Sequence, residues 1–124
     1  MADLLPYLDA ANVDLKSFSD DIYKRISGGH LQPVLDTIIA MKQAGVWVEI
    51  TNLVIPGIND DMDMIRQMCR WLNDNRLAEA PLHFTRFFPR YRMQDIPPTP
   101  LPTLQAAKRI AEEEGIKYVY LGNV

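Results

Sequence analysis

A carboxylate and an ammonium group, on Asp14 and Lys16, stand two residues apart in the sequence Asn12-Val13-Asp14-Leu15-Lys16. Side chains alternate along a strand, so a strand here would point both groups to the same face. The pair could be a salt bridge that fills the interior of a barrel, or it could grip a polar ligand, with the lysine as a point charge for a carboxylate. Because ligands of β/α barrels gather at the carboxyl ends of the strands, we predict that the pair binds a ligand.

The segment from Gly45 to Asp61 (GVWVEITNLVIPGINDD) must position further candidates. Its run of β-branched and aromatic residues from Val46 to Ile55 predicts a strand that Pro56-Gly57 ends. Alternation gives one apolar face, interrupted only by Asn52, and a second face with polar groups that comprises Trp47, Glu49, Thr51, Leu53 and Ile55. Thr51 and Leu53 lie nearer the loop and are the better candidates for ligand contact, whereas Glu49 is either a hydrogen-bonded filler or functional.

A basic and aromatic cluster follows the predicted third strand, Leu82 to Phe88. It comprises Arg86, Phe87, Phe88, Arg90, Tyr91 and Arg92. The cluster is either a solvated rim or a positive mouth for a carboxylate, phosphate or peptide substrate. We favour the mouth for Arg86 and the rim for Arg90 and Arg92. We interpret His83, near the start of this strand, as a structural histidine.

The order of helices and strands predicts the fold class. The order helix, strand, loop, helix around residues 33–74 is the repeating unit of a parallel sheet. Helices are also expected at 22–26 and from a Thr103 cap to Gly115, and a fourth strand at 117–121. Strands that are apolar on one face only favour helices on one side of the sheet, since doubly covered strands are apolar throughout. We therefore predict an α/β fold, a partial β/α barrel with about four parallel strands.

Size and composition limit the class of protein. At 124 residues the chain is a single domain, 1–124, which is small for a complete barrel. A net charge of −3 gives no general attraction to nucleic acid or to an anionic membrane, and we expect a cytoplasmic protein. The one cysteine, Cys69, excludes a multi-cysteine metal site built by this chain alone, and its place on an apolar helical stripe predicts burial. His30 and His83 have no partners at metal-ligand spacing.

Four motifs together resemble a known family. They are DAANVDLKSF (9–18), GVWVEITNLVIPGINDD (45–61), PLHFTRFFPRYRMQDIPPTP (81–100) and GIKYVYLGNV (115–124). In this order they resemble the C-terminal half of radical S-adenosylmethionine (radical SAM) enzymes related to pyruvate formate-lyase activating enzyme, in particular the radical SAM member of the AmmeMemoRadiSam system. The resemblance implies a (β/α)₆ barrel, of which this chain would hold the last three or four strands.

The resemblance also implies a cofactor site. Asp14 and Lys16 match the D-x-K strand of the family, which contacts the amino-acid end of S-adenosylmethionine, and Asp14 would help to hold a monovalent cation together with the backbone at Asn12. Thr51 and Leu53 match cofactor-contacting positions. Val54, Ile55 and Pro56 would lie beside the adenine.

A substrate mouth at Arg86, Phe88 and Tyr91 completes the implied site. The activating enzymes carry a histidine near the position of Phe88, and Arg86 is our candidate to replace it. The substrate could be a protein or a small molecule.

The implied reaction is the reductive cleavage of S-adenosylmethionine by a [4Fe–4S] cluster, which yields a 5′-deoxyadenosyl radical that abstracts hydrogen from the substrate. This chain lacks the family's C-x-x-x-C-x-x-C loop and its glycine-glycine-glutamate strand. We therefore expect a C-terminal portion of a larger oxidoreductase, inactive alone, with no Fe–S ligands of its own and with strand edges through which it could self-associate. Two rival functions stay open at this point: a barrel lyase with a Schiff base on a desolvated Lys16, and a non-catalytic α/β interaction module.

Overall fold

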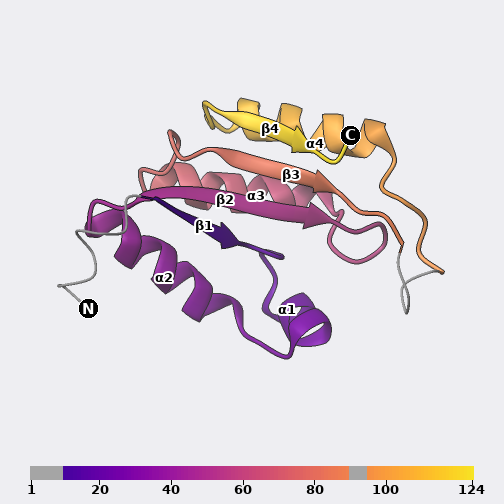
Figure 1. The fold of residues 1–124 in the computed structure, drawn as a ribbon, viewed down its shortest axis with the longest axis horizontal. Coiled ribbons are helices and arrows are strands. Elements are labelled where there is room, and N and C mark those ends of the chain that lie inside the picture. The colour runs from indigo at the N-terminus through magenta and orange to yellow at the C-terminus, as the bar shows by residue number, and fades with distance from the viewer. Residues whose placement is uncertain (1–9, 90–94) are drawn as a thin grey trace.

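The computed structural model of the chain describes residues 10–89 and 95–124, and these form a parallel sheet with helices (Figure 1). The sheet has four strands in the order β1-β2-β3-β4. The elements are β1 (Ala10–Asp14), α1 (Asp20–Ser27), α2 (Leu31–Gln43), β2 (Trp47–Val54), α3 (Met62–Asp74), β3 (Leu82–Arg86), α4 (Leu101–Glu113) and β4 (Val119–Gly122). Sequential parallel strands joined by helical crossovers are the arrangement of a β/α barrel wall, which confirms the predicted fold class.

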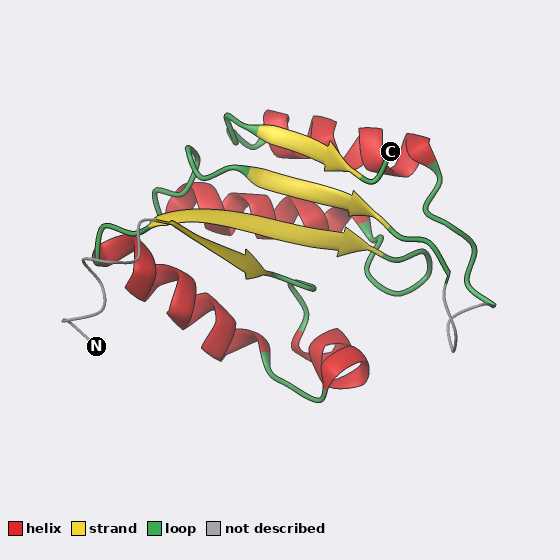
Figure 2. Cartoon of the chain, viewed as in Figure 1, coloured by secondary structure: helices red, strands yellow, loops and turns green. Residues whose placement is uncertain are grey.

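The two faces of the sheet differ as the alternation predicts. In β2, Val48, Ile50, Asn52 and Val54 are buried, whereas Trp47, Glu49, Thr51 and Leu53 are at least partly exposed. Figure 2 shows α3 and α4 behind the strands, so that no helix of the described residues covers the near face of the sheet. We call this uncovered side the open face. The apolar core therefore lies between the sheet and its helices, and the polar side chains of the strands lie on the open face.

Side-chain hydrogen bonds to backbone N–H groups fix where helices α1 and α3 begin. The Ser19 side chain accepts a hydrogen bond from the Ile22 N–H at the start of α1, and the Asp61 side chain accepts one from the Asp63 N–H at the start of α3. The buried stripe of α3 contains Met64, Ile65, Met68, Cys69 and Leu72. This stripe is the one that the sequence predicts, and it places α3 against the sheet.

Several predicted boundaries are wrong by a few residues. Strand β1 ends at Asp14 rather than Lys16, because the Lys16 N–H leaves the sheet and donates to the Tyr23 hydroxyl at 2.9 Å. Strand β3 ends at Arg86 rather than Phe88, and β4 covers 119–122 rather than 117–121.

The predicted starts of two helices are also wrong. Helix α2 begins at Leu31, before Pro33, since the Asp20 carboxylate of the neighbouring helix accepts from the Leu31 N–H. Helix α4 begins at Leu101, so Thr103 lies inside the helix and does not cap it.

Within residues 10–89 and 95–124, no helix is both long enough and apolar enough to cross a membrane. The cytoplasmic location stays a prediction.

Candidate functional site

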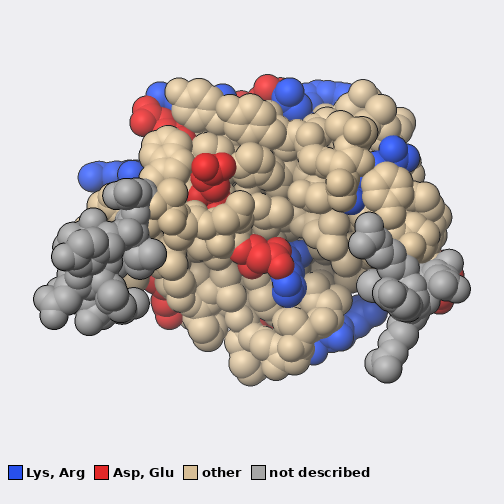
Figure 3. All heavy atoms as spheres, viewed as in Figure 1, with Lys and Arg blue, Asp and Glu red and all other residues tan. Residues whose placement is uncertain are grey.

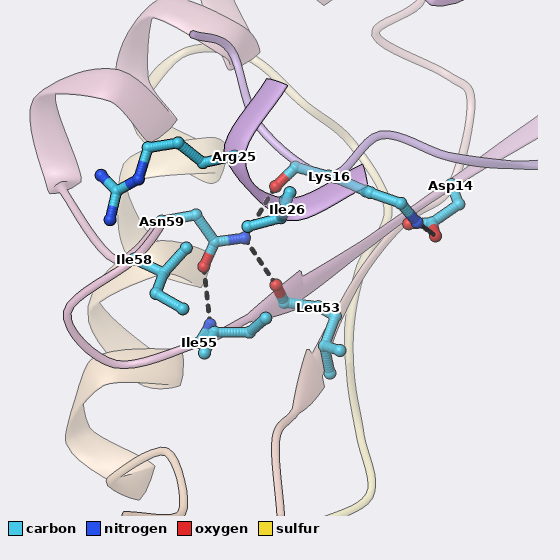
Figure 4. A pocket seen from close by; sticks show the side chains of 8 residues that line it. All are labelled: Asp14, Lys16, Arg25, Ile26, Leu53, Ile55, Ile58 and Asn59. Atoms are coloured by element: carbon cyan, nitrogen blue, oxygen red, sulfur yellow. Dashed lines mark hydrogen bonds and ion pairs between the residues drawn. The ribbon is translucent and has the colours of Figure 1, made fainter. Parts of the chain in front are cut away.

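A cavity of about 410 Å³ lies at the carboxyl ends of β1 and β2. It is lined by Asp14, Lys16, Arg25, Ile26, Leu53, Ile55, Ile58 and Asn59 (Figure 4). These residues come from the ends of two strands, from α1 and from the loop after β2. Both the volume and the mixture of apolar and polar groups are typical of a small-molecule site, which spans about 300–1,000 Å³.

The Asp14 carboxylate and the Lys16 ammonium are in direct contact at one side of this cavity (Figure 4). The side chains therefore share a side of the sheet, as predicted, although Lys16 lies beyond the end of β1. They remain open to solvent, with 54% of the Asp14 side chain and 37% of the Lys16 side chain exposed. The Schiff-base hypothesis requires a desolvated lysine, and this exposed, carboxylate-paired Lys16 does not meet that requirement.

The Asn59 side chain links the segments around the cavity by hydrogen bonds. Its side chain is buried, and its amide group donates to the main-chain oxygens of Lys16 and Leu53, each at 2.7 Å. Its Oδ1 accepts from the Ile55 N–H at 2.6 Å (Figure 4). One side chain thus joins the ends of β1 and β2 to the loop that follows β2, and fixes where Lys16 leaves the sheet.

The loop after β2 takes a defined turn. Pro56 and Gly57 occupy its two central positions, the Ile58 N–H donates to the Ile55 oxygen at 3.1 Å, and Gly57 has a φ of +77°. This is the arrangement of a type II turn, which needs a residue that tolerates positive φ at the second central position. The turn carries Ile58 and Asn59 back toward the cavity.

The predicted cofactor residues in β2 and directly after it take three different places. Leu53 and Ile55 line the cavity and give it an apolar wall. Thr51 lies farther back on the open face, where its hydroxyl donates to the Asn12 side chain at 2.8 Å, and it is not among the lining residues. The Val54 side chain does not reach the cavity either, because it is fully buried on the face that the helices cover.

The predicted substrate residues lie at the end of β3. The Arg86 guanidinium donates to the Thr99 main-chain oxygen at 2.7 Å and lies 5.1 Å from the centre of the Phe88 ring. Phe88 is 42% exposed, and Tyr91 lies outside the described residues. Arg86 thus ties the proline-rich segment to β3, and a substrate role for these three residues stays a prediction.

Four of the residues that line the cavity were not predicted from the sequence to be site residues. Arg25 and Ile26 belong to α1, which the chain brings over the end of β1, and Ile58 and Asn59 belong to the loop after β2. For Ile58 and Asn59, the one indication in the sequence was the motif V-I-P-G-I-N-D-D, because an asparagine that follows a Pro-Gly turn can form hydrogen bonds with main-chain groups.

The residues of this chain do not fit an iron–sulfur cluster. Cys69 is the one cysteine of the sequence; it is fully buried in α3, and burial raises the pKa of its thiol to about 12. Over residues 10–89 and 95–124, no group of three or more His, Cys, Asp and Glu side chains is placed to hold a metal ion. Cluster binding requires several thiolates, so these residues cannot form such a site. A monovalent cation at Asp14 stays a prediction.

Comparison with protein families decides the class of this chain. The family model of the Radical SAM superfamily matches residues 1–72, more than half of the sequence. The chain belongs to the radical SAM superfamily.

Two relatives show how much of a radical SAM protein the chain represents. It is 46% identical over 117 residues to an uncharacterized protein of Methanocaldococcus jannaschii, covering 94% of this chain and 35% of that protein. It is 24% identical over 130 residues to the pyruvate formate-lyase 1-activating enzyme of Escherichia coli K12, covering 95% of this chain and 52% of that enzyme. The chain therefore spans about a third to a half of the relatives it matches.

Solved structures agree with the radical SAM assignment at the level of the fold. A domain of pyruvate-formate lyase-activating enzyme from Bacteroides vulgatus superimposes with a TM-score of 0.79 over 98% of this chain and 73% of that one, at 16% identity. A radical SAM methyltransferase from Sphaerobacter thermophilus gives 0.65 over 98% and 39%, also at 16% identity. These values confirm the barrel-type fold and the resemblance to the activating enzymes.

Proposed function

We propose that this chain forms a cofactor-binding wall of a radical SAM enzyme and that its cavity binds S-adenosylmethionine. The observation that carries the proposal is the juxtaposition of the Asp14–Lys16 pair with the apolar side chains of Leu53 and Ile55 around one cavity. Membership of the radical SAM superfamily supports the identity of the ligand.

The chemistry of the cavity suits the two ends of this cofactor. S-adenosylmethionine carries an ammonium and a carboxylate at one end and an adenine ring at the other. Asp14 would accept hydrogen bonds from the ammonium, and Lys16 would donate to the carboxylate. Leu53, Ile55 and Ile58 would pack against the ring, because apolar side chains gain from covering its faces. Asn59 would not contact the reacting atoms but would position these groups through its main-chain hydrogen bonds.

The reaction we propose is the reductive cleavage of S-adenosylmethionine, similar to that of a glycyl-radical activating enzyme. In that chemistry the cofactor would supply a 5′-deoxyadenosyl radical, and the residues of this chain would bind and orient the cofactor. The cysteine ligands of a [4Fe–4S] cluster would have to lie outside these 124 residues, since this sequence contains only Cys69. Arg86, Phe88 and Tyr91 would contact the substrate, a protein or a small molecule.

Equilibrium binding tests the cofactor site without any cluster. We expect isothermal titration calorimetry to detect weak binding of S-adenosylmethionine to the chain. Asp14→Ala and Lys16→Ala should each weaken it about three- to tenfold, the size of a partly exposed charged contact. Glu79→Ala and Lys117→Ala are matched controls, because they break another exposed acid–lysine pair, at 3.0 Å, that does not line the cavity. Equal affinity in the wild type and both site variants would refute the cofactor site, and a folded monomer without any such affinity would favour the interaction module.

A further inference from the structure

A second polar pair lies on the open face, away from the cavity. The Glu49 Oε1 and the His83 Nε2 are 2.7 Å apart, and the other carboxylate oxygen of Glu49 accepts from the Trp47 indole N–H at 3.3 Å. The side chains of Glu49 and His83 are 35% and 30% exposed. Glu49 therefore has both oxygens engaged, while part of His83 remains accessible.

The hydrogen bond determines which nitrogen of His83 is free. His83 is the main reason why the pKa of Glu49 is lowered, so Glu49 is a carboxylate and the proton of the hydrogen bond resides on Nε2. In the neutral imidazole the other nitrogen, Nδ1, is then an acceptor. Nδ1 has no hydrogen-bond partner among the described residues, and it is not one of their enclosed polar atoms. When the imidazole is neutral, the site therefore offers an accessible acceptor at Nδ1, and the hydrogen bond with Glu49 fixes the tautomer of His83.

One aromatic ring stacks on His83, and a second, that of Trp47, donates a hydrogen bond to Glu49. The Tyr120 ring stacks on the His83 ring, with 5.3 Å between the centres and 27° between the planes. Tyr120 and Trp47 are 50% and 48% exposed, and both side chains lie on the open face of the sheet. Exposed ring surfaces beside a hydrogen-bond acceptor suit a flat ligand that carries a donor, because aromatic rings stack at centre distances of about 4.5–7 Å.

The strand register relates this pair to the cavity. Asp14 pairs with Thr51, Thr51 with His83 and His83 with Tyr120, so one row of side chains crosses all four strands. Adjacent strands are about 4.8 Å apart, which puts His83 roughly 10 Å from Asp14 along this row. A ligand at His83 would therefore be a neighbour of the ligand in the cavity. Figure 3 shows that the open face around these sites is mostly uncharged, with one group of acidic atoms standing apart and another touching basic atoms.

We propose that His83 is a substrate-binding residue whose Nδ1 accepts a hydrogen bond from a hydroxyl or N–H group on a flat, aromatic-type ring, with Glu49 as its positioning residue and Tyr120 and Trp47 as its ring contacts. That the ligand is the substrate rests on the proposed function, since it depends on S-adenosylmethionine occupying the neighbouring cavity. The binding of the ring itself does not depend on that cofactor.

Nuclear magnetic resonance titration of the full chain with two probes tests the site. Phenol carries an O–H donor on a flat ring, and anisole has the same ring without the donor. We expect phenol to shift the His83 imidazole and Trp47 indole signals and to bind about three- to tenfold more tightly than anisole, the contribution of one hydrogen bond. Equal affinities for the two probes, or no shift at His83 with phenol, would overturn the proposal.

Three variants separate the acceptor from the rings. His83→Phe keeps a ring but removes the acceptor, and should abolish the preference for phenol. Glu49→Gln frees the tautomer and should reduce that preference while leaving anisole binding unchanged, a readout that a merely structural role would not give. Tyr120→Leu should weaken both probes equally. An unchanged phenol preference in folded His83→Phe and Glu49→Gln would refute the assignment.

The same samples distinguish this proposal from the cofactor site. Asp14→Ala should leave phenol binding unchanged, and His83→Phe should leave S-adenosylmethionine binding unchanged. If the chain binds phenol as expected but not S-adenosylmethionine, the cofactor proposal and the assignment of the ring as substrate fail, whereas the ring site stands. The converse result removes only the ring site.

Discussion

The side-chain amide of Asn59 donates to the main-chain oxygen of Lys16, 43 residues earlier, over 2.7 Å. Lys16 comes just after β1 and Asn59 lies after β2, so this bond joins the two segments where both leave the sheet. The direction in which the chain departs after Asp14 decides where the Lys16 ammonium lies. Asn59 therefore acts on the cavity through the backbone rather than through its own contact with a ligand.

Replacing Asn59 should destabilise the fold as well as the cavity. Asn59→Ala removes three hydrogen bonds of 2.6–2.7 Å and leaves the Ile55 N–H without its acceptor. We expect the free energy of unfolding, measured with urea, to fall by about 2–4 kcal/mol. Asn59→Asp should be no milder at neutral pH, because a carboxylate oxygen would face two carbonyl oxygens.

The control for this prediction is Asp60→Ala. It removes one exposed hydrogen bond to the Gly57 N–H at 3.1 Å from the same turn, and should cost less than about 1 kcal/mol. A loss of the same size in Asn59→Ala and Asp60→Ala would show that Asn59 does not join the two strand ends.

Side-chain alternation explains why part of the site could be predicted from the sequence. Asp14 and Leu53 belong to β1 and β2, and the two-residue period of a strand predicts that Lys16 and Ile55, which lie just beyond the strand ends, fall on the same side. The same rule predicts the buried face of β2. It also places Val54 on the opposite side from Leu53, which is why a stretch of consecutive residues could not all line one cavity.

The remaining parts of the site depend on contacts between distant segments. Thr99 shows this most clearly: its buried hydroxyl donates to the Val54 oxygen at 2.6 Å and accepts from the Phe87 N–H at 2.8 Å. Both partners are main-chain groups, which every residue possesses, so the residue types in the sequence could not predict these hydrogen bonds. The approach of Arg25 to the end of β1 depends in the same way on the course of residues 15–19.

An acid-sensitive clamp joins α3 to α4. The Glu114 carboxylate accepts from the Arg66 guanidinium at 2.6 Å and from the Arg70 guanidinium at 2.9 Å, and these bonds hold the pKa of Glu114 below its ordinary value of 4.5. A carboxyl group with a lowered folded-state pKa stabilises the fold above its unfolded-state pKa, and this stabilisation disappears as the pH falls through the folded-state value.

Glu114→Gln tests the clamp through its pH dependence. We expect the wild type to be more stable than this variant at pH 7, with a constant difference down to about pH 5 that shrinks below about pH 4.5. Urea denaturation of both proteins across this range measures the difference. Glu112→Gln is the control, because the exposed Glu112 side chain forms no ion pair with any other described residue. A difference for Glu114→Gln that persists unchanged to pH 3 would contradict the assignment.

Cys69 should be unreactive while the chain is folded. The thiolate is the form of cysteine that attacks disulfide reagents and binds metals, and burial in the core raises the pKa of this thiol to about 12. At pH 8 we expect a disulfide reagent to label the native chain on the order of a thousandfold more slowly than the urea-unfolded chain, whose thiol has a pKa of about 8.5. Cys69→Ala, which has no thiol, supplies the background. Equally rapid labelling of the native and unfolded chains would show that Cys69 is accessible as a thiolate and would contradict its burial in the core.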